Sequence, residues 1–111
     1  MDVGPFLERL REDEGLTSDL DQAEALRMLD WLGEQVGQRV AKARSEEKAW
    51  EQVDALARRA RGIARVVGVF RDEGAEAAAQ RAAQAKIAWP ADAGELSVGE
   101  LLERLLQGEA S

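Results

Sequence analysis

Acidic side chains are the residues of this 111-residue chain best suited to chemistry, because carboxylates can hold a hard cation that activates water. Two groups stand out. Glu47, Glu51 and Asp54 share one helix face, and Asp72, Glu73 and Glu76 lie near an expected helix start. Such groups would suit a metal-dependent hydrolase, which is the enzymatic alternative for this sequence.

The two acidic groups give the chain a loose resemblance to the all-α nucleotide pyrophosphohydrolases, which carry acidic motifs on facing helices. That family holds Mg²⁺ with an EExxE motif and an ExxD motif on the next helix. Here Glu46, Glu47 and Glu51 are misspaced, and the ExxD pair of Glu51 and Asp54 lies on the same helix. In a straight hairpin the two acidic groups would also lie about 30 Å apart. We therefore assign the chain to no family.

The residue types that are missing narrow the chemistry further. His, Cys and Tyr are absent, so the chain has no imidazole base, no thiol nucleophile and no soft metal ligand. Any catalysis would depend on carboxylates, Lys, Arg and a hard cation. We therefore expect no catalytic residue, no metal site and no cofactor, and we favour a role that does not involve catalysis.

The overall composition is that of an acidic globular protein. Apolar residues make up 45% and charged residues 33%, and the net charge is −7. Apolar runs are far shorter than the roughly 20 residues that cross a membrane. The acidic N-terminus is unlike a signal peptide, and the lack of cysteine suits a cytoplasmic location. We expect a cytoplasmic protein with no membrane contact, formed by a single domain over residues 1–111.

Apolar periodicity and capping residues predict five helices. Pro5 suits the first turn of the first helix, Thr17 or Ser18 caps the second, and Ser45 caps the third. Ser97 and Glu100 form a capping box at the start of the last. The expected ranges are 4–14, 18–44, 46–72, 75–88 and 97–108. A break at Gly74 separates the third and fourth helices, and one continuous helix to residue 88 is the alternative.

The second and third helices, each about 26 residues or 39 Å long, are joined by a very short turn. The sequence thus predicts an all-α helical bundle built on a long antiparallel αα-hairpin with short N- and C-terminal helices. Leu29, Leu32, Val36 and Val40 are expected to pack on a heptad seam formed by Val53, Leu56, Ala60 and Ile63. In this register Arg59 and Arg71 lie beside the acidic first half of the second helix.

Both long helices carry apolar or small residues outside this seam, which suggests an interaction surface. The candidates are Met28, Trp31, Gly33, Gly37, Val66 and Val69. Gly33 and Gly37, with Ala41, form a ridge of small residues. We interpret this ridge as a close crossing with another helix of the same chain, and a protein partner is the alternative. Surplus apolar surface predicts a homodimer.

A basic stripe on the third helix consists of Arg58, Arg61 and Arg65. A phosphate or nucleic-acid partner would use such a stripe, but no aromatic residue is interleaved for base stacking. We expect a solvated face or a docking surface for the acidic C-terminal segment, and nucleic acid as an unfavoured partner. The leading hypothesis is a helical protein–protein interaction or self-association module that acts by binding. A nucleic-acid-associated accessory protein is the second alternative.

Overall fold

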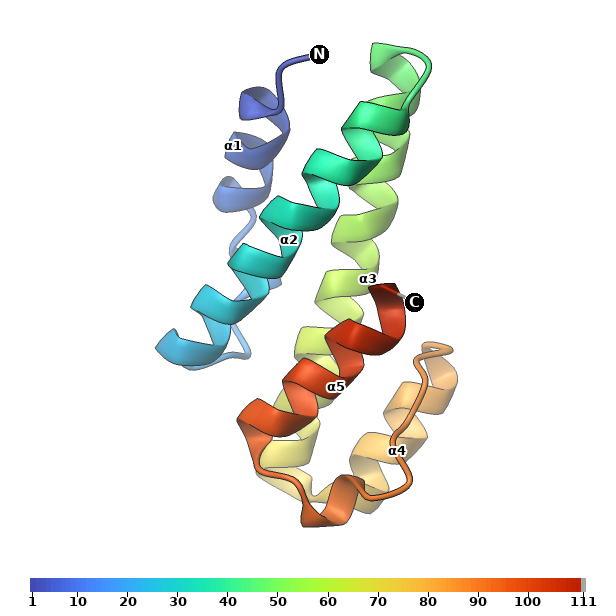
Figure 1. Cartoon of the computed structure of the whole chain (residues 1–111). Coiled ribbons are helices and arrows are strands. Elements are labelled where there is room, and N and C mark those ends of the chain that lie inside the picture. The colour runs from blue at the N-terminus through green and yellow to red at the C-terminus, as the bar shows by residue number, and fades with distance from the viewer. Residues whose placement is uncertain (111) are drawn as a thin grey trace.

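The computed structural model describes residues 1–110, and every regular element in this range is helical, which confirms the all-α prediction. Five α-helices and two short 3₁₀ helices follow one another along the chain (Figure 1). They are α1 (Gly4–Glu12), η1 (Glu14–Leu16), α2 (Gln22–Lys42), α3 (Glu46–Glu73), α4 (Ala75–Gln84), η2 (Ala93–Glu95) and α5 (Val98–Ala110). No helix within residues 1–110 is long and apolar enough to span a membrane.

Helix α3 is the central element, because it contacts each of the other four α-helices. Helices α2 and α3 meet at a short turn and run in opposite directions from it, while α1 lies beside the half nearest the turn (Figure 1). Helices α4 and α5 lie against the far half of α3. The result is an elongated molecule with principal extents of 42 × 24 × 18 Å.

The heptad seam of α3 forms the core of this bundle. Its members are almost fully buried, with exposed fractions of 2% or less: Val53, Leu56, Ala60, Ile63 and Val67. Leu32, Val36 and Val40 of α2 are buried in the same core, whereas Leu29 is only partly buried. Helix α5 adds four buried leucines: Leu101, Leu102, Leu105 and Leu106.

The start of α2 differs from the sequence prediction. Thr17 and Ser18 lie in a turn after η1, and the N-cap of α2 is Asp21. Its carboxylate accepts the Glu24 N–H at 2.8 Å, and the Glu24 carboxylate accepts the Asp21 N–H at 3.0 Å. This reciprocal capping box satisfies two amides at the helix start. A single hydroxyl cap at Thr17 or Ser18 would satisfy fewer amides.

Helix α3 ends at Gly74, so the predicted break is confirmed and the continuous helix is wrong. Gly74 has φ 97° and ψ 178°, a backbone conformation that is essentially restricted to glycine. The chain reverses there, and α4 packs back along α3. The break therefore depends on the missing side chain at this position.

We expect Gly74→Ala to lower the free energy of unfolding by about 1–2 kcal/mol, because alanine is strained at this φ and ψ. Gly94→Ala is the matched control, since Gly94 lacks a positive φ and an added Cβ would meet no atom within 4 Å. Urea denaturation of both variants measures the difference. Equal stability of the two would contradict strain at Gly74.

Helix α4 ends at residue 84, four residues before the predicted end at 88. The Ile87 N–H donates to the Ala82 carbonyl at 2.8 Å and the Lys86 N–H to the Ala83 carbonyl at 3.2 Å. Lys86 has a left-handed φ of 56°. This is the Schellman arrangement of a helix C-terminus. The apolar side chain that usually accompanies this motif is Ile87, which is 5% exposed, and its burial stabilises the turn.

Helix α5 begins with the capping box that the sequence predicts. The Ser97 N–H donates to the Glu100 carboxylate at 3.0 Å, and the Glu100 N–H donates to the Ser97 hydroxyl at 3.2 Å. Hydrogen bonds from the backbone and side chain of Ser97 lower the pKa of Glu100. The ionised cap therefore stabilises the helix above the ordinary glutamate pKa, and this contribution is lost as the pH falls through the lowered value.

Polar contacts join α2 and α3 near both ends of α2. Arg71 forms an ion pair with Glu24, as the charge pattern predicts, and also donates to the Asp19 carbonyl at 2.8 Å. Near the turn, Arg39 donates to the Gln52 side chain at 3.3 Å. The Arg71 contacts join the acidic start of α2 to the end of α3, and the Arg39 contact joins the end of α2 to the start of α3.

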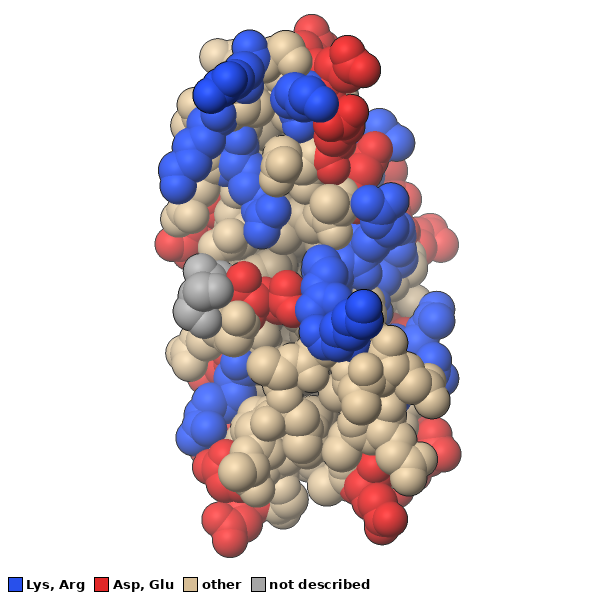
Figure 2. Space-filling model, turned by 90° about the vertical axis from the view of Figure 1, so that its right-hand side faces the viewer, with Lys and Arg blue, Asp and Glu red and all other residues tan. Residues whose placement is uncertain are grey.

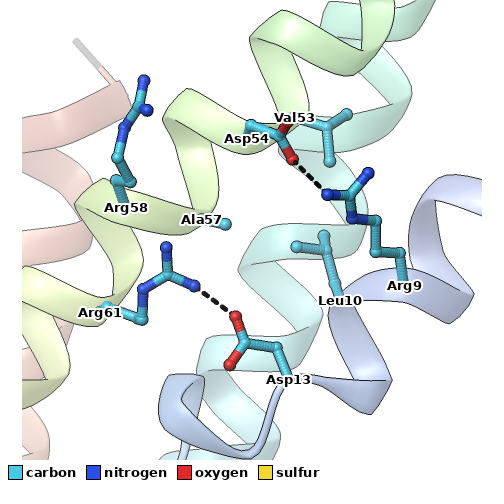
Figure 3. Close-up of a pocket in the computed structure, with 8 residues that line it drawn as sticks. All are labelled: Arg9, Leu10, Asp13, Val53, Asp54, Ala57, Arg58 and Arg61. Carbon is cyan, nitrogen blue, oxygen red and sulfur yellow. Dashed lines mark hydrogen bonds and ion pairs between the residues drawn. The ribbon is translucent and has the colours of Figure 1, made fainter.

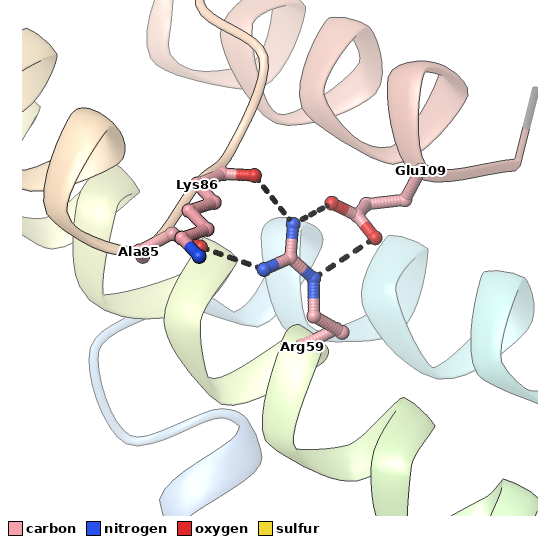
Figure 4. A network of polar contacts seen from close by, with 4 residues as sticks. All are labelled: Arg59, Ala85, Lys86 and Glu109. Carbon is pink, nitrogen blue, oxygen red and sulfur yellow. Dashed lines mark hydrogen bonds and ion pairs between the residues drawn. The ribbon is translucent and has the colours of Figure 1, made fainter.

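The prediction that Arg59 lies beside the acidic half of α2 is wrong. Its guanidinium donates to the Ala85 carbonyl at 2.6 Å and the Lys86 carbonyl at 3.0 Å, and forms an ion pair with Glu109 of α5 (Figure 4). The hydrogen bond to Glu109 raises the pKa of Arg59. We call this set of four residues the Arg59 cluster. It joins α3, the end of α4 and the last turns of α5.

Candidate functional site

An apolar groove between α1 and α2 is the strongest candidate for a binding surface. Its cavity volume is about 400 Å³. Five leucines and a glycine line it, with three charged residues: Leu7, Leu10, Leu26, Leu29, Leu32 and Gly33, with Arg11, Asp30 and Glu34. Leu26 is 58% exposed, and Met1 is the one other large apolar side chain within residues 1–110 that is comparably exposed. A leucine this exposed beside an apolar groove suits a contact with another surface.

The glycines of α2 continue this surface along the helix. Leu26, Gly33 and Gly37 recur at spacings of seven and four, so they lie on one line of the helix. A Cβ added at Gly33 or Gly37 would meet no atom within 4 Å. The predicted close crossing with another helix of the same chain is therefore wrong. The outer ridge of α2, defined as Leu26, Gly33, Gly37 and Ala41, has open space beside its glycines within the described part of the chain.

The other predicted interaction residues are either fully or partly buried. Met28 and Val66 have an exposed fraction of 0%, so they are core residues that no partner can reach. Their helix faces are covered because α4 and α5 pack on the hairpin from sides that local periodicity does not reveal. Trp31 and Val69 are partly buried. The indole N–H of Trp31 has no hydrogen-bond partner within the described residues.

The three arginines of the basic stripe also differ in exposure and contacts. Figure 2 shows one face of the molecule on which basic side chains gather over the upper and middle parts, above a part with few charges. Arg61 is partly buried and forms an ion pair with Asp13, which follows α1. Arg58 and Arg65 are exposed, and neither side chain has a hydrogen bond or ion pair among residues 1–110. The stripe is therefore partly solvated, and one member joins α3 to the end of α1.

The acidic C-terminal segment does not dock on this stripe. Asp92 pairs with Arg104 of α5 at 3.2 Å, and Glu103 pairs with Arg27 of α2. These acids are satisfied by nearer cations, because α5 packs between α2 and α3 and away from the stripe. Docking of the C-terminal segment on Arg58, Arg61 and Arg65 is therefore wrong.

The acidic side chains form no candidate metal centre in the described part of the chain, where no group of three or more could hold a metal ion. Glu47 and Glu51 are exposed near the start of α3, and Asp72 and Glu73 are exposed at its far end. The length of α3 separates the two groups.

The sequence matches no protein-family model, and neither a curated protein nor a solved structure shows significant similarity to it. Gly33 is the one groove residue that sequence reasoning assigned to an interaction surface, and the exposed Leu26 was missed. Leu26 shares a helix line with Gly33 and Gly37, and this spacing was the signal that could have added it to the ridge.

Proposed function

We propose that the protein is a helical self-association module that acts by binding, and that two copies pair through the outer ridge of α2 and the α1–α2 groove. The observation that carries the proposal is the exposed Leu26 beside a leucine-lined groove on a helix whose two glycines face open space. Each glycine inside a helix costs about 1 kcal/mol relative to alanine. No close contact within residues 1–110 uses this space, whereas a partner helix would.

The ridge is self-complementary under a two-fold axis, which favours a second copy of this chain as the partner. If two α2 helices cross antiparallel at Gly33, residues whose numbers add to about 66 lie opposite one another. Leu29 then lies opposite Gly37 of the second copy, and Leu26 opposite its Ala41. Each large side chain meets a small one, so the helices can approach closely.

Charge along α2 favours the same antiparallel orientation. The start of the helix is capped by Asp21, and its C-terminal end carries Lys42, with Arg44 two residues beyond. Antiparallel pairing sets the acidic start of each α2 near the basic end of the second copy, whereas parallel pairing sets like charges together. Such exposed pairs contribute little stability, but they select orientation.

Light scattering at tens of micromolar protein tests the proposal. We expect a mass of twice the 12.1 kDa chain mass. Leu26→Glu should shift the mass to that of one chain, because it places a charge within the contact, opposite Ala41 of the second copy. Gly37→Leu should do the same by filling the space for Leu29 of the second copy.

The matched control is Ala83→Glu, which adds the same charge at an exposed position on α4, away from the ridge. This variant should remain dimeric. A parent mass of 12.1 kDa at these concentrations would overturn the proposal. A dimer that survives both Leu26→Glu and Gly37→Leu would place the interface elsewhere.

A cytoplasmic location remains a prediction from the absence of cysteine.

A further inference from the structure

A second cavity, between α1 and α3, has a different chemistry from the groove. Its volume is about 270 Å³, and two aspartates, three arginines and three buried apolar residues line it (Figure 3). The lining residues are Arg9, Asp13, Asp54, Arg58 and Arg61 above Leu10, Val53 and Ala57. Three cations against two carboxylates leave this α1–α3 pocket with a net charge of +1, in a chain whose net charge is −7.

Two of the guanidinium groups are held in place from opposite sides of the pocket. Arg9 lies over the Trp50 ring, with its guanidinium carbon 5.0 Å from the ring centroid. Arg61 pairs with Asp13, whose carboxylate also accepts the Gly15 N–H at 3.0 Å. Figure 3 shows Arg9 and Arg61 reaching toward the pocket from α1 and α3. Both groups are therefore positioned before any ligand arrives.

The two remaining charged side chains of the pocket, Asp54 and Arg58, are weakly engaged. The nearest nitrogen of Arg9 lies 3.6 Å from an Asp54 oxygen, and both side chains are about half exposed. Such a contact contributes little. Arg58 is exposed and turned away from the other two arginines, and it has no partner among residues 1–110. An anion can replace Asp54 as the partner of Arg9 and attract the Arg58 side chain into the pocket with little loss of free energy.

We propose that the α1–α3 pocket binds a small organic phosphate. Guanidinium groups donate paired hydrogen bonds to phosphate and carboxylate oxygens. A planar carboxylate is satisfied by one such fork, whereas the tetrahedral phosphate presents three terminal oxygens, enough for Arg9, Arg61 and an Arg58 side chain that turns inward. The buried floor of Leu10, Val53 and Ala57 contacts the organic part. None of the charged residues of this site belongs to α2 or to the proposed self-association surface, although Leu10 lines both cavities.

Titration of the whole chain with inorganic phosphate and with phenyl phosphate, followed by amide chemical shifts of the pocket, tests the proposal. Both should bind saturably, with phenyl phosphate the tighter and acetate much the weaker. Arg58→Gln should weaken phenyl phosphate binding at least tenfold. Asp54→Asn should tighten it, because the carboxylate that competes for Arg9 is removed.

Arg65→Gln is the matched control, since Arg65 lies on the same helix, is exposed and unpaired among the described residues, and lies outside the pocket. It should leave the affinity unchanged. Equal weakening by Arg58→Gln and Arg65→Gln, or tighter binding of a single-stranded oligonucleotide that both variants abolish, would show a diffuse basic face and overturn the proposal. No saturable binding at tens of millimolar phosphate, or weaker binding by Asp54→Asn, would overturn it as well.

Discussion

Arg71→Leu is expected to lower the free energy of unfolding by about 3 kcal/mol, the largest effect we predict for a single substitution. Its partner Glu24 has a side chain that is only 8% exposed. Without Arg71 the Glu24 carboxylate retains one hydrogen bond, from the Asp21 N–H. A buried charge that loses its counter-ion is strongly destabilising, because the folded state no longer repays its desolvation.

Urea denaturation of Arg71→Leu and of a double variant that also carries Glu24→Gln measures this effect. The double variant should recover part of the loss, because the unpaired buried charge is gone. Arg65→Leu is the control for removing an arginine from the same helix, and it should change stability by less than about 0.5 kcal/mol. An equal loss in Arg65→Leu and Arg71→Leu would contradict a specific role for the ion pair.

Arg59→Ala is expected to lower the free energy of unfolding by about 2 kcal/mol, the second largest effect. Its guanidinium binds two carbonyls at the end of α4 and the Glu109 carboxylate of α5 (Figure 4). The Schellman turn leaves these carbonyls without helical donors. Because Arg59 is partly exposed, water replaces some of the lost hydrogen bonds and limits the effect.

Hydrogen exchange distinguishes this role from a general loss of stability. Amides of the last turns of α5 and of residues 85–87 should exchange faster in Arg59→Ala, while amides near the α2–α3 turn change less. Arg59→Lys should recover only part of the protection, because an ammonium group cannot form the paired contacts. Arg58→Ala, one residue earlier and without a partner among residues 1–110, should leave exchange unchanged. The same fast exchange in Arg58→Ala would contradict the role of the cluster.

Several elements could be predicted from the sequence because their causes are local. The heptad seam of α3 identified Val53, Leu56 and Ile63 as core residues, and all three are buried. The capping box at Ser97 and the break at Gly74 were also predicted correctly. Each depends on residues within a few positions of one another, since helix periodicity and caps are set by neighbouring residues.

Competition between local signals caused the errors at helix ends. Thr17 and Ser18 are good N-caps, but the reciprocal pair of Asp21 and Glu24 satisfies two amides and determines the start of α2. The end of α4 depends on Lys86 in a left-handed conformation, which lysine rarely adopts and which its sequence neighbours do not indicate.

The helical class, the core face of α3 and the absence of imidazole and thiol chemistry were determined by the sequence by itself. Only the tertiary structure decided that Met28 and Val66 are covered, that Gly33 and Gly37 face open space, and that Arg59 binds α4 and α5. Periodicity states which residues share a helix face, but not which face meets a neighbour. That outcome depends on how α1, α4 and α5 rotate and cross against α2 and α3, and these crossings are set jointly by side chains far apart in the sequence.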